Sequence, residues 1–323
     1  MSRAVVVHRT GGPEVLSIED RKLGAPGPGE LLIRNRAIGL NFIDVYQRTG
    51  FYALPLPFVA GNEGAGEVLA IGEGVRDFAT GDRVAYMGPV GAYADERLLP
   101  ADNAVKLPDA VSYEQGAALM MKGGTAYYLL HDTWALRMGE TVLVHAAAGG
   151  VGSLLAQWAT AIRARVIGTA GSSEKRARAR DNGCIAVIDY AEPDWPAQVK
   201  EAAGGQGVDV IYDGVGGAVF EGNIDCLRPR GLLASYGSAS GAVSIPNLGV
   251  LANKGSLYVT RPTSRHYLGS PQTLRKAMAS VFEALANGKI RAAIDQSFPL
   301  AQVAEAHRAL EARETTGMTV LIP

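Results

Sequence analysis

The sequence predicts an α/β fold of two parts: a β-rich part with a partly antiparallel, barrel-like sheet, and a part with a doubly wound parallel sheet. Length is the first observation, because 323 residues suggest about two domains of roughly 150 residues each. Second, apolar segments of strand length, separated by Gly and Pro, fill residues 1 to about 120. Third, apolar strands alternate with helical patterns from about residue 123, which is the spacing of β-α-β units.

Four strands are expected in the β-rich part, each rich in Val, Ile or other apolar residues. No long helical pattern lies between them, which favours a partly antiparallel sheet. Residues 24–30 are expected to form a turn rather than a linker, because an apolar strand resumes at once. The expected strands are AVVVH (4–8), ELLIRNRAIGL (30–40), EGAGEVLAIG (63–72) and DRVAYM (82–87).

The parallel part contains strands of the fully buried type, about 20 to 45 residues apart. Helical patterns at residues 151–164 and 172–183 lie between some of them. This arrangement predicts a parallel sheet with helices on its faces. The expected strands are TVLVHAAAGG (141–150), RVIGTAG (165–171), VDVIYDGVGG (208–217) and GLLASYG (231–237).

The last 60 or so residues change pattern again. Residues 274–290 predict one amphipathic helix and residues 301–314 a second, with Val303, Ala306 and Leu310 on its apolar face. An apolar strand, MTVLIP, ends the chain at 318–323. A tail of this length is small for a core of its own, so it is expected to return to the first part. The domains are therefore predicted as 1–122 with 264–323, and 123–263.

Composition and charge exclude several classes of protein. The formal net charge is −1, so the chain has no general electrostatic attraction to nucleic acid or acidic lipid. Hydrophobic residues make up 47%, which argues against disorder. The N-terminal residues do not resemble a signal peptide, and no apolar stretch reaches the roughly 18 residues of a membrane span. We expect a cytoplasmic globular protein.

The strongest motif is Ala147-Ala148-Gly149-Gly150-Val151-Gly152, which follows one predicted strand and opens a predicted helix. It is a variant of the G-x-G-x-x-G turn with Ala at the first glycine. Small residues let backbone N–H groups approach a pyrophosphate, and the helix N-terminus adds the positive end of its dipole. The segment therefore predicts a dinucleotide site formed by Ala148 to Gly152. An ordinary tight turn between strand and helix is the alternative.

The end of the second strand favours NADPH over NADH. An NAD site has an acidic residue about 20 positions after the turn begins. Residues 167–170 contain no acid and are followed by Ser172, Ser173, Lys175 and Arg176. Hydroxyls and a cation suit a 2′-phosphate, which an acid would repel. The alternative is that both cations only cover an exposed helix, a stronger objection for Arg176 than for Lys175.

Metal ligands and a hydrolase nucleophile are not indicated. Cys184 and Cys226 both fall in the nucleotide-binding part, and the five histidines show no ligand spacing. His145 in a predicted strand and His307 on a predicted helix are better explained as structural residues. We expect neither a catalytic nor a structural metal. No G-x-S-x-G segment is present in the sequence.

End to end, the chain resembles the zinc-independent quinone oxidoreductases, the zeta-crystallin-like branch of the medium-chain dehydrogenase/reductase superfamily. Zinc-dependent relatives carry histidine where this chain has Asn62, a cysteine ligand in the region of GLNFID, and a four-cysteine lobe that is missing here. The resemblance rests on GLNFIDVYQRTGFY (39–52), GNEGAGEV (61–68), GDRVAY (81–86), MKGGTAYYLL (121–130), AAAGGVG (146–152), VIDY (187–190) and GSLYVTRP (255–262).

The resemblance implies a GroES-like, partly barrel-shaped catalytic domain and a Rossmann domain. It also implies a homodimer formed through an edge strand, for which 255–262 is the candidate. It implies that Asn41, Tyr46 and Tyr52 line the pocket for substrate and nicotinamide. It places the remaining residues around NADPH: Thr125 at a phosphate or ribose, Lys175 and Tyr190 at the 2′-phosphate, Tyr236, Gly237 and Ser238 at the nicotinamide ribose, and Arg313 at a phosphate.

Each of these residues also has a plainer interpretation. Asn41, Tyr46 and Tyr52 could be ordinary polar packing near turns. Thr125 could cap a helix, Tyr190 could end a strand, 236–238 could be a simple turn, and Arg313 could lie on a solvated helix face. Gly214, Gly216 and Gly217 are weaker cofactor candidates, because glycines after a strand can serve only the turn. Relatives often carry Phe where Tyr236 aligns, so the substrate is less securely implied than the fold.

The expected reaction is hydride transfer from NADPH to a quinone. Tyr46 and Tyr52 could each donate a hydrogen bond to a carbonyl oxygen as charge develops on it. An NADPH-dependent reductase of conjugated enones or enals shares every motif. A non-enzymatic, crystallin-like NADPH-binding protein is a third possibility, and the neutral charge weighs against RNA binding. No nucleic-acid or membrane partner is expected.

Overall fold

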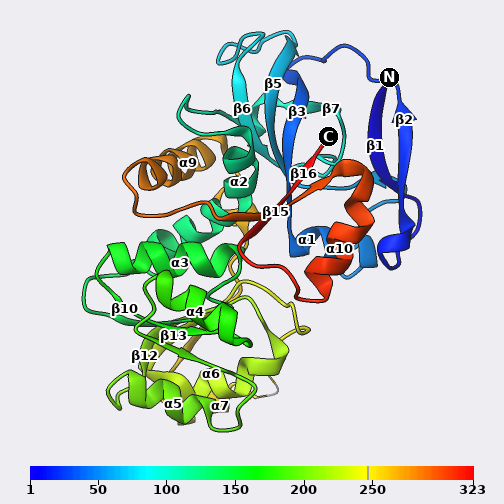
Figure 1. Cartoon of the computed structure of the whole chain (residues 1–323). Helices are drawn as coiled ribbons and strands as arrows, with labels where there is room; N and C mark the ends of the chain where they lie inside the picture. Colours follow the sequence, from blue (N-terminus) through cyan, green and yellow to red (C-terminus); the bar gives the residue numbers. More distant parts are fainter. Residues whose placement is uncertain (246) are drawn as a thin grey trace. The chain divides into compact units, whose positions relative to one another are not determined.

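A computed structural model describes residues 1–245 and 247–323 (Figure 1). Contacts between Cα atoms divide the chain into two compact units. Unit 1 comprises Met1–Gly124, Ser270–Ala286 and Ala292–Pro323, and unit 2 comprises Thr125–Gly269 and Asn287–Arg291. Each unit has its own sheets and its own buried apolar core.

Unit 1 is built on a seven-stranded sheet and a three-stranded sheet. Neighbours in the larger sheet are antiparallel, except that the two C-terminal strands run parallel to each other. The larger sheet has the order β15 (Ile294–Pro299), β16 (Met318–Ile322), β3 (Glu30–Leu40), β5 (Glu63–Ile71), β6 (Arg83–Met87) and β8 (Ala104–Lys106), with β7 (Glu96–Pro100) also paired to β3. The smaller has the order β2 (Leu16–Arg21), β1 (Ser2–Val7) and β4 (Phe58–Val59).

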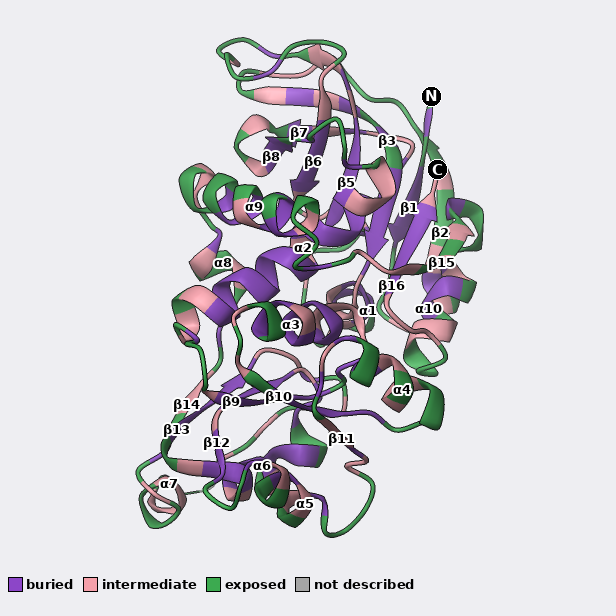
Figure 2. Cartoon of the chain, turned by 60° about the vertical axis from the view of Figure 1, so that its left-hand side comes forward, coloured by how far each residue is buried: buried purple, intermediate pink, exposed green. Residues whose placement is uncertain are grey.

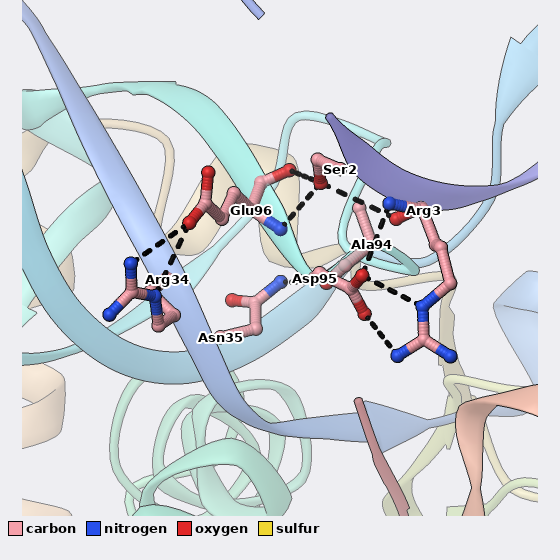
Figure 3. A network of polar contacts seen from close by, with 7 residues as sticks. All are labelled: Ser2, Arg3, Arg34, Asn35, Ala94, Asp95 and Glu96. Atoms are coloured by element: carbon pink, nitrogen blue, oxygen red, sulfur yellow. Dashed lines mark hydrogen bonds and ion pairs between the residues drawn. The ribbon is translucent and has the colours of Figure 1, made fainter. Parts of the chain in front are cut away.

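Polar contacts join the two sheets of unit 1, as Figure 3 shows. Arg3 of β1 donates two hydrogen bonds to the Asp95 carboxylate, at 2.9 and 3.0 Å. Arg34 of β3 reaches Glu96 of β7 at 3.2 Å, and the Ser2 hydroxyl accepts from the Glu96 N–H at 2.9 Å. These contacts hold β1 beside the start of β7.

Four helices belong wholly or largely to unit 1. The short α1 (Phe42–Thr49) directly follows β3, and α10 (Val303–Glu311) precedes the last strand. The other two are α2 (Tyr113–Tyr128) and α9 (Pro271–Ala286). The inward face of α10 contributes Val303 and Ala306 to the core, as its periodicity predicts, and the half-buried Leu310 packs against them.

Unit 2 is a six-stranded, entirely parallel sheet. In Figures 1 and 2, α3 lies on one face of it and α5 and α6 lie on the other. The strand order is β11 (Ala186–Ile188), β10 (Arg165–Thr169), β9 (Thr141–Val144), β12 (Val208–Asp213), β13 (Leu227–Ser235) and β14 (Tyr258–Thr260). The helices are α3 (Gly150–Ala161), α4 (Ser173–Asp181), α5 (Trp195–Ala202), α6 (Phe220–Cys226), α7 (Gly249–Asn253) and α8 (Ser264–Tyr267).

The strand order of unit 2 is that of the doubly wound dinucleotide-binding fold, numbered 3-2-1-4-5-6 along the chain. The topological switch point lies between the neighbouring strands β9 and β12. Ligands in such sheets bind beyond the carboxyl ends of the strands at this point. The α/β class predicted from the sequence is confirmed.

Short 3₁₀ and π segments complete the fold: Pro13–Val15, Ala101–Asn103, Leu129–Thr133, Gly217–Val219 and Leu300–Gln302. Within the described part of the chain, no helix combines the length and the apolar character needed to cross a bilayer.

Candidate active site

The glycine-rich turn connects β9 to α3 in unit 2. Gly149 is the N-cap of α3 and offers no side chain to cap the helix, so the first amides of α3 are left for another acceptor. A Cβ on Gly152 would lie 2.2 Å from the carbonyl oxygen of Ala146, a distance that no side chain tolerates. Ala146 itself has φ of +50°. The turn therefore requires glycine at 152 in order to fold back on itself.

A series of buried, hydrogen-bonded side chains supports this turn. These contacts were not predicted from the sequence. His145 lies one residue beyond β9, not inside the strand, and is fully buried. Burial lowers its pKa, so its ring is neutral and makes one donor and one acceptor contact. Nε2 donates to Asn223 Oδ1 at 2.6 Å, and Nδ1 accepts from the Thr169 hydroxyl at 2.9 Å. Thr169 Oγ1 in turn accepts from the N–H of Ala146, at 3.3 Å.

The end of β10 leads into α4 through Ser172. Ser172 is the N-cap residue of α4, and its hydroxyl oxygen accepts a hydrogen bond from the Lys175 N–H at 3.2 Å. Lys175 therefore lies in the first turn of α4, just beyond the carboxyl end of β10. Arg176 donates to Asp189 at 3.0 Å in a half-buried ion pair, which supports its plainer interpretation.

Four further predicted cofactor residues lie on loops at the carboxyl ends of β11 and β13. Tyr190 is half-buried and packs against the apolar core of unit 2. Tyr236 and Gly237 follow β13, and both backbone N–H groups donate to the carbonyl oxygen of Asp213 at the end of β12, at 2.8 and 3.2 Å. Ser238 follows them and is buried. Backbone hydrogen bonds thus join the ends of β12 and β13.

Glycines also determine the contact between these two loops. A Cβ on Gly237 would lie 2.4 Å from the carbonyl oxygen of Gly214, so the strand ends touch backbone to backbone. Gly216 has φ of +92°, and its N–H donates to Asp213 Oδ1 at 3.0 Å. Burial raises the pKa of this Asp213 carboxyl. The geometry of the turn is therefore sufficient to explain why glycine occupies positions 214 and 216, without a contact to the cofactor.

Two residues occupy positions different from those expected. Thr125 lies inside α2, which begins at Tyr113, so it does not cap a helix at 125. The Ser112 hydroxyl accepts from the Gln115 N–H at 3.2 Å, so the helix is capped at 112 and begins earlier than its apolar pattern suggests. Arg313 lies two residues beyond the end of α10, with φ of +59°, and not on the helix.

The predicted substrate residues lie together in unit 1. Asn41 is the N-cap of α1, and its side-chain Nδ2 donates to Glu63 at 2.8 Å. Tyr46 on α1 and Tyr52 just after it have ring centroids 5.3 Å apart in an edge-to-face arrangement. Tyr52 is 39% exposed, which leaves this residue accessible to a small molecule.

Buried charges surround Asn41, and sequence reasoning missed them. Glu63 is fully buried and accepts from Lys122 Nζ at 3.0 Å and from the Met121 N–H at 2.6 Å. Asp44 on α1 is also buried and accepts from the Asn41 N–H at 2.8 Å. Only the spacing of Asp44, three residues after an N-cap asparagine, could have indicated it.

Two family descriptions match the chain: "Alcohol dehydrogenase GroES-like domain" at residues 27–109 and "Zinc-binding dehydrogenase" at residues 150–283. A quinone oxidoreductase of Pseudomonas aeruginosa is 49% identical over 325 residues, covering all of both chains. The chain belongs to the quinone oxidoreductases of the medium-chain dehydrogenase/reductase superfamily.

Two other members of the superfamily extend the comparison. The structure of Escherichia coli quinone oxidoreductase complexed with NADPH matches this quinone oxidoreductase with a TM-score of 0.97, at 44% identity and 100% coverage of both chains. A 2-haloacrylate reductase of Burkholderia is 42% identical and covers 100% of this chain and 99% of its own.

The residues of this quinone oxidoreductase do not suit zinc, despite the wording of the second family description. Asn62 Nδ2 donates to Asp44 and to Gln47, both at 2.7 Å, so its amide already serves unit 1. Cys184 and Cys226 are buried, and burial raises the pKa of each thiol to about 12, which opposes the thiolate form that binds metal. Among residues 1–245 and 247–323, no three His, Cys, Asp or Glu side chains gather as metal ligands.

Proposed function

We propose that this protein transfers a hydride from NADPH to a quinone without a metal. One observation carries the proposal. In unit 2, the turn at Ala148–Gly152 and the acid-free end of β10 occur in a chain that is 44% identical over its whole length to a quinone oxidoreductase complexed with NADPH. When bound, NADPH supplies the hydride, and the protein supplies binding and orientation.

The residues of unit 2 bind and orient the cofactor. The first amides of α3 receive the pyrophosphate, with the positive end of the helix dipole behind them. The Lys175 ammonium and the Ser172 and Tyr190 hydroxyls recognise the 2′-phosphate. Thr125, Tyr236, Gly237 and Ser238 hold the nicotinamide end. Arg313, which belongs to unit 1, is the further residue for a phosphate.

The residues of unit 1 act on the acceptor. Asn41, Tyr46 and Tyr52 line its pocket, and the two phenol hydroxyls donate hydrogen bonds to a carbonyl oxygen as negative charge develops. A quinone needs no strong acid in the site, because conjugation already stabilises its reduced anion. Replacing both tyrosines by Phe is expected to lower turnover while NADPH binding is retained.

An activated alkene is the second candidate acceptor. The 42% identity to a 2-haloacrylate reductase favours it, because an acrylate is also a conjugated acceptor of hydride. The residues described above are compatible with both acceptors, and the shape of the acceptor pocket decides between them.

The deciding experiment follows NADPH oxidation with phenanthrenequinone and with cyclohexenone in parallel. Turnover of the quinone with NADPH, and much weaker turnover with NADH, is the expected result. Turnover of cyclohexenone alone would move the function to the second candidate. Tight NADPH binding without either reaction would contradict both and favour a binding protein.

Lys175→Ala tests the cofactor preference separately. Removing one charge-assisted contact to a 2′-phosphate is expected to weaken NADPH binding by about 10- to 100-fold, with NADH binding unchanged. Arg176→Ala is the matched control, because Arg176 is the adjacent cation in the same helical turn and forms an ion pair with Asp189. Equal losses in the two variants, measured by fluorescence titration with NADPH, would contradict the role of Lys175.

The proposal includes a cytoplasmic homodimer. It also includes a catalytic domain formed by residues 1–122 and 264–323, and a cofactor domain formed by residues 123–263. Support for the dimer comes from β14, which ends the strand order of the six-stranded sheet and has Tyr258 59% exposed. An exposed edge strand with an aromatic side chain can pair with a second copy.

A further inference from the structure

A chain of buried side chains in unit 1 connects α10 to the N-terminus of α1. It runs from Arg48 through His307 and Tyr93 to Asp44. Arg48 NH1 lies 3.1 Å from His307 Nδ1, His307 Nε2 lies 3.2 Å from the Tyr93 hydroxyl, and that hydroxyl lies 3.0 Å from Asp44 Oδ2. All four residues are at most 2% exposed.

The direction of every hydrogen bond in this chain is determined by its first member. A guanidinium can only donate, so His307 Nδ1 must accept and its proton must be on Nε2. His307 is neutral, because burial and the Arg48 charge lower its pKa to about 3. Nε2–H therefore donates to Tyr93, and Tyr93 is left to donate its own proton to Asp44.

The chain of side chains is anchored at Arg48 and at Tyr93. Arg48 forms a two-pronged ion pair with Glu311 of α10, at 2.7 and 2.9 Å, and also donates to the carbonyl of Gly11 at 3.1 Å. The Tyr93 ring fits against Gly61, where a Cβ would lie 2.1 Å from the ring. Side-chain rotation is therefore restricted at Arg48 and at Tyr93.

At the other end, Asp44 accepts from three donors: the Tyr93 hydroxyl, the Asn62 amide and the Asn41 backbone N–H. The Asp44 N–H donates to the carbonyl of Asn41 at 3.1 Å. The Asn41 side chain is held separately by Glu63, which Lys122 neutralises. The backbone and the side chain of Asn41 are thus held by two different buried carboxylates.

We propose that Tyr93 and His307 are positioning residues for the reaction, because their directed hydrogen bonds hold Asp44 and, through it, Asn41 at the start of α1. This inference rests on the proposed function, in which Asn41 lines the acceptor pocket. It adds a dependence of turnover on α10, which carries His307 and Glu311.

The test compares Tyr93→Phe with Tyr86→Phe. Tyr86 is the matched control, because it is equally buried in unit 1 and donates one hydrogen bond, to Asn35 Oδ1 at 2.7 Å, outside this chain. Tyr93→Phe is expected to lower kcat for phenanthrenequinone about 10- to 100-fold, the scale of a small misplacement of a reacting partner. The Kd for NADPH should change less than about twofold in both variants.

A pH profile separates positioning from general damage. Asp44 in Tyr93→Phe loses one of the donors that stabilise its ionised form, so the acid limb of kcat should move to higher pH. Glu63 is the charged group that acts on Asp44, and Lys122 pairs with Glu63. Arg48 and Glu311 pair with each other at the opposite end of the chain, and neither tyrosine variant alters any of these groups. Tyr86→Phe should keep the profile of the unmodified protein.

A second pair of variants keeps the test decisive if Tyr93→Phe does not fold. His307→Gln retains an acceptor for Arg48 and a donor for Tyr93, whereas His307→Leu has neither. Higher kcat in His307→Gln than in His307→Leu is expected. Equal kcat in that pair, or equal kcat and pH profiles in the two tyrosine variants, would overturn the inference alone. Absence of turnover in the unmodified protein would overturn the proposed function and this inference with it.

Discussion

Two buried residues, Asp44 and His307, carry pKa values far from those of the unfolded chain. Burial raises the pKa of Asp44 from 3.8 to about 6 and lowers that of His307 from 6.5 to about 3. Native Asp44 therefore binds a proton between 3.8 and about 6 that the unfolded chain lacks, so this residue makes stability fall as pH rises. His307 has the opposite effect between about 3 and 6.5, because there only the unfolded chain binds the proton.

The two effects oppose each other in the window they share, and single variants should separate them. Asp44→Asn is expected to make the loss of stability toward acid steeper by about 1.4 kcal/mol per pH unit. His307→Gln should make it shallower by a similar amount. Urea unfolding from pH 4 to pH 6 measures both slopes relative to the unmodified protein. Slopes that change in the same direction in both variants would contradict these assignments.

At the scale of elements, the turn between β9 and α3 depends on a single glycine, Gly152. Gly152→Ala places a Cβ 2.2 Å from the carbonyl of Ala146. We expect a loss of about 1–3 kcal/mol in the free energy of unfolding, the range for overpacked sites, together with weaker NADPH binding because the amides of α3 move.

Gly24→Ala is the control for this change, because a Cβ at Gly24 would meet no atom within 4 Å. Urea unfolding and NADPH titration of both variants provide the measurement. If Gly152→Ala is as stable as Gly24→Ala and binds NADPH equally well, the close approach seen in the turn does not matter to either property.

At the scale of the whole molecule, assembly is the property to test. If β14 pairs with its counterpart in a second copy, sedimentation should give twice the chain mass of 33.9 kDa. Tyr258→Glu places a charge at this edge and should shift the protein toward the monomer. Met138→Glu, at another exposed apolar residue of unit 2, should not. A monomeric unmodified protein, or the same mass in both variants, would exclude a dimer through β14.

Local patterns in the sequence predicted much of this architecture. Residues 30–40 form β3 with the predicted bounds, and residues 83–87 form β6 within the predicted segment, because alternation and apolar runs are properties of neighbouring residues. The turn at 147–152 was recognisable because its small residues and flanking elements are contiguous. Helices without a strong apolar pattern, such as α6 and α7, were missed, since tertiary packing stabilises them.

The sequence by itself determined the α/β class, the nucleotide-binding turn and the lack of an acid at the end of β10, because each depends on residues close together in the chain. Only the tertiary structure decided how Asp44, Tyr93 and His307 meet. Tyr93 and His307 are 214 positions apart in the sequence, yet they share one hydrogen bond. A buried polar group is stabilised by its partners in space, and these depend on how strands and helices from distant segments pack.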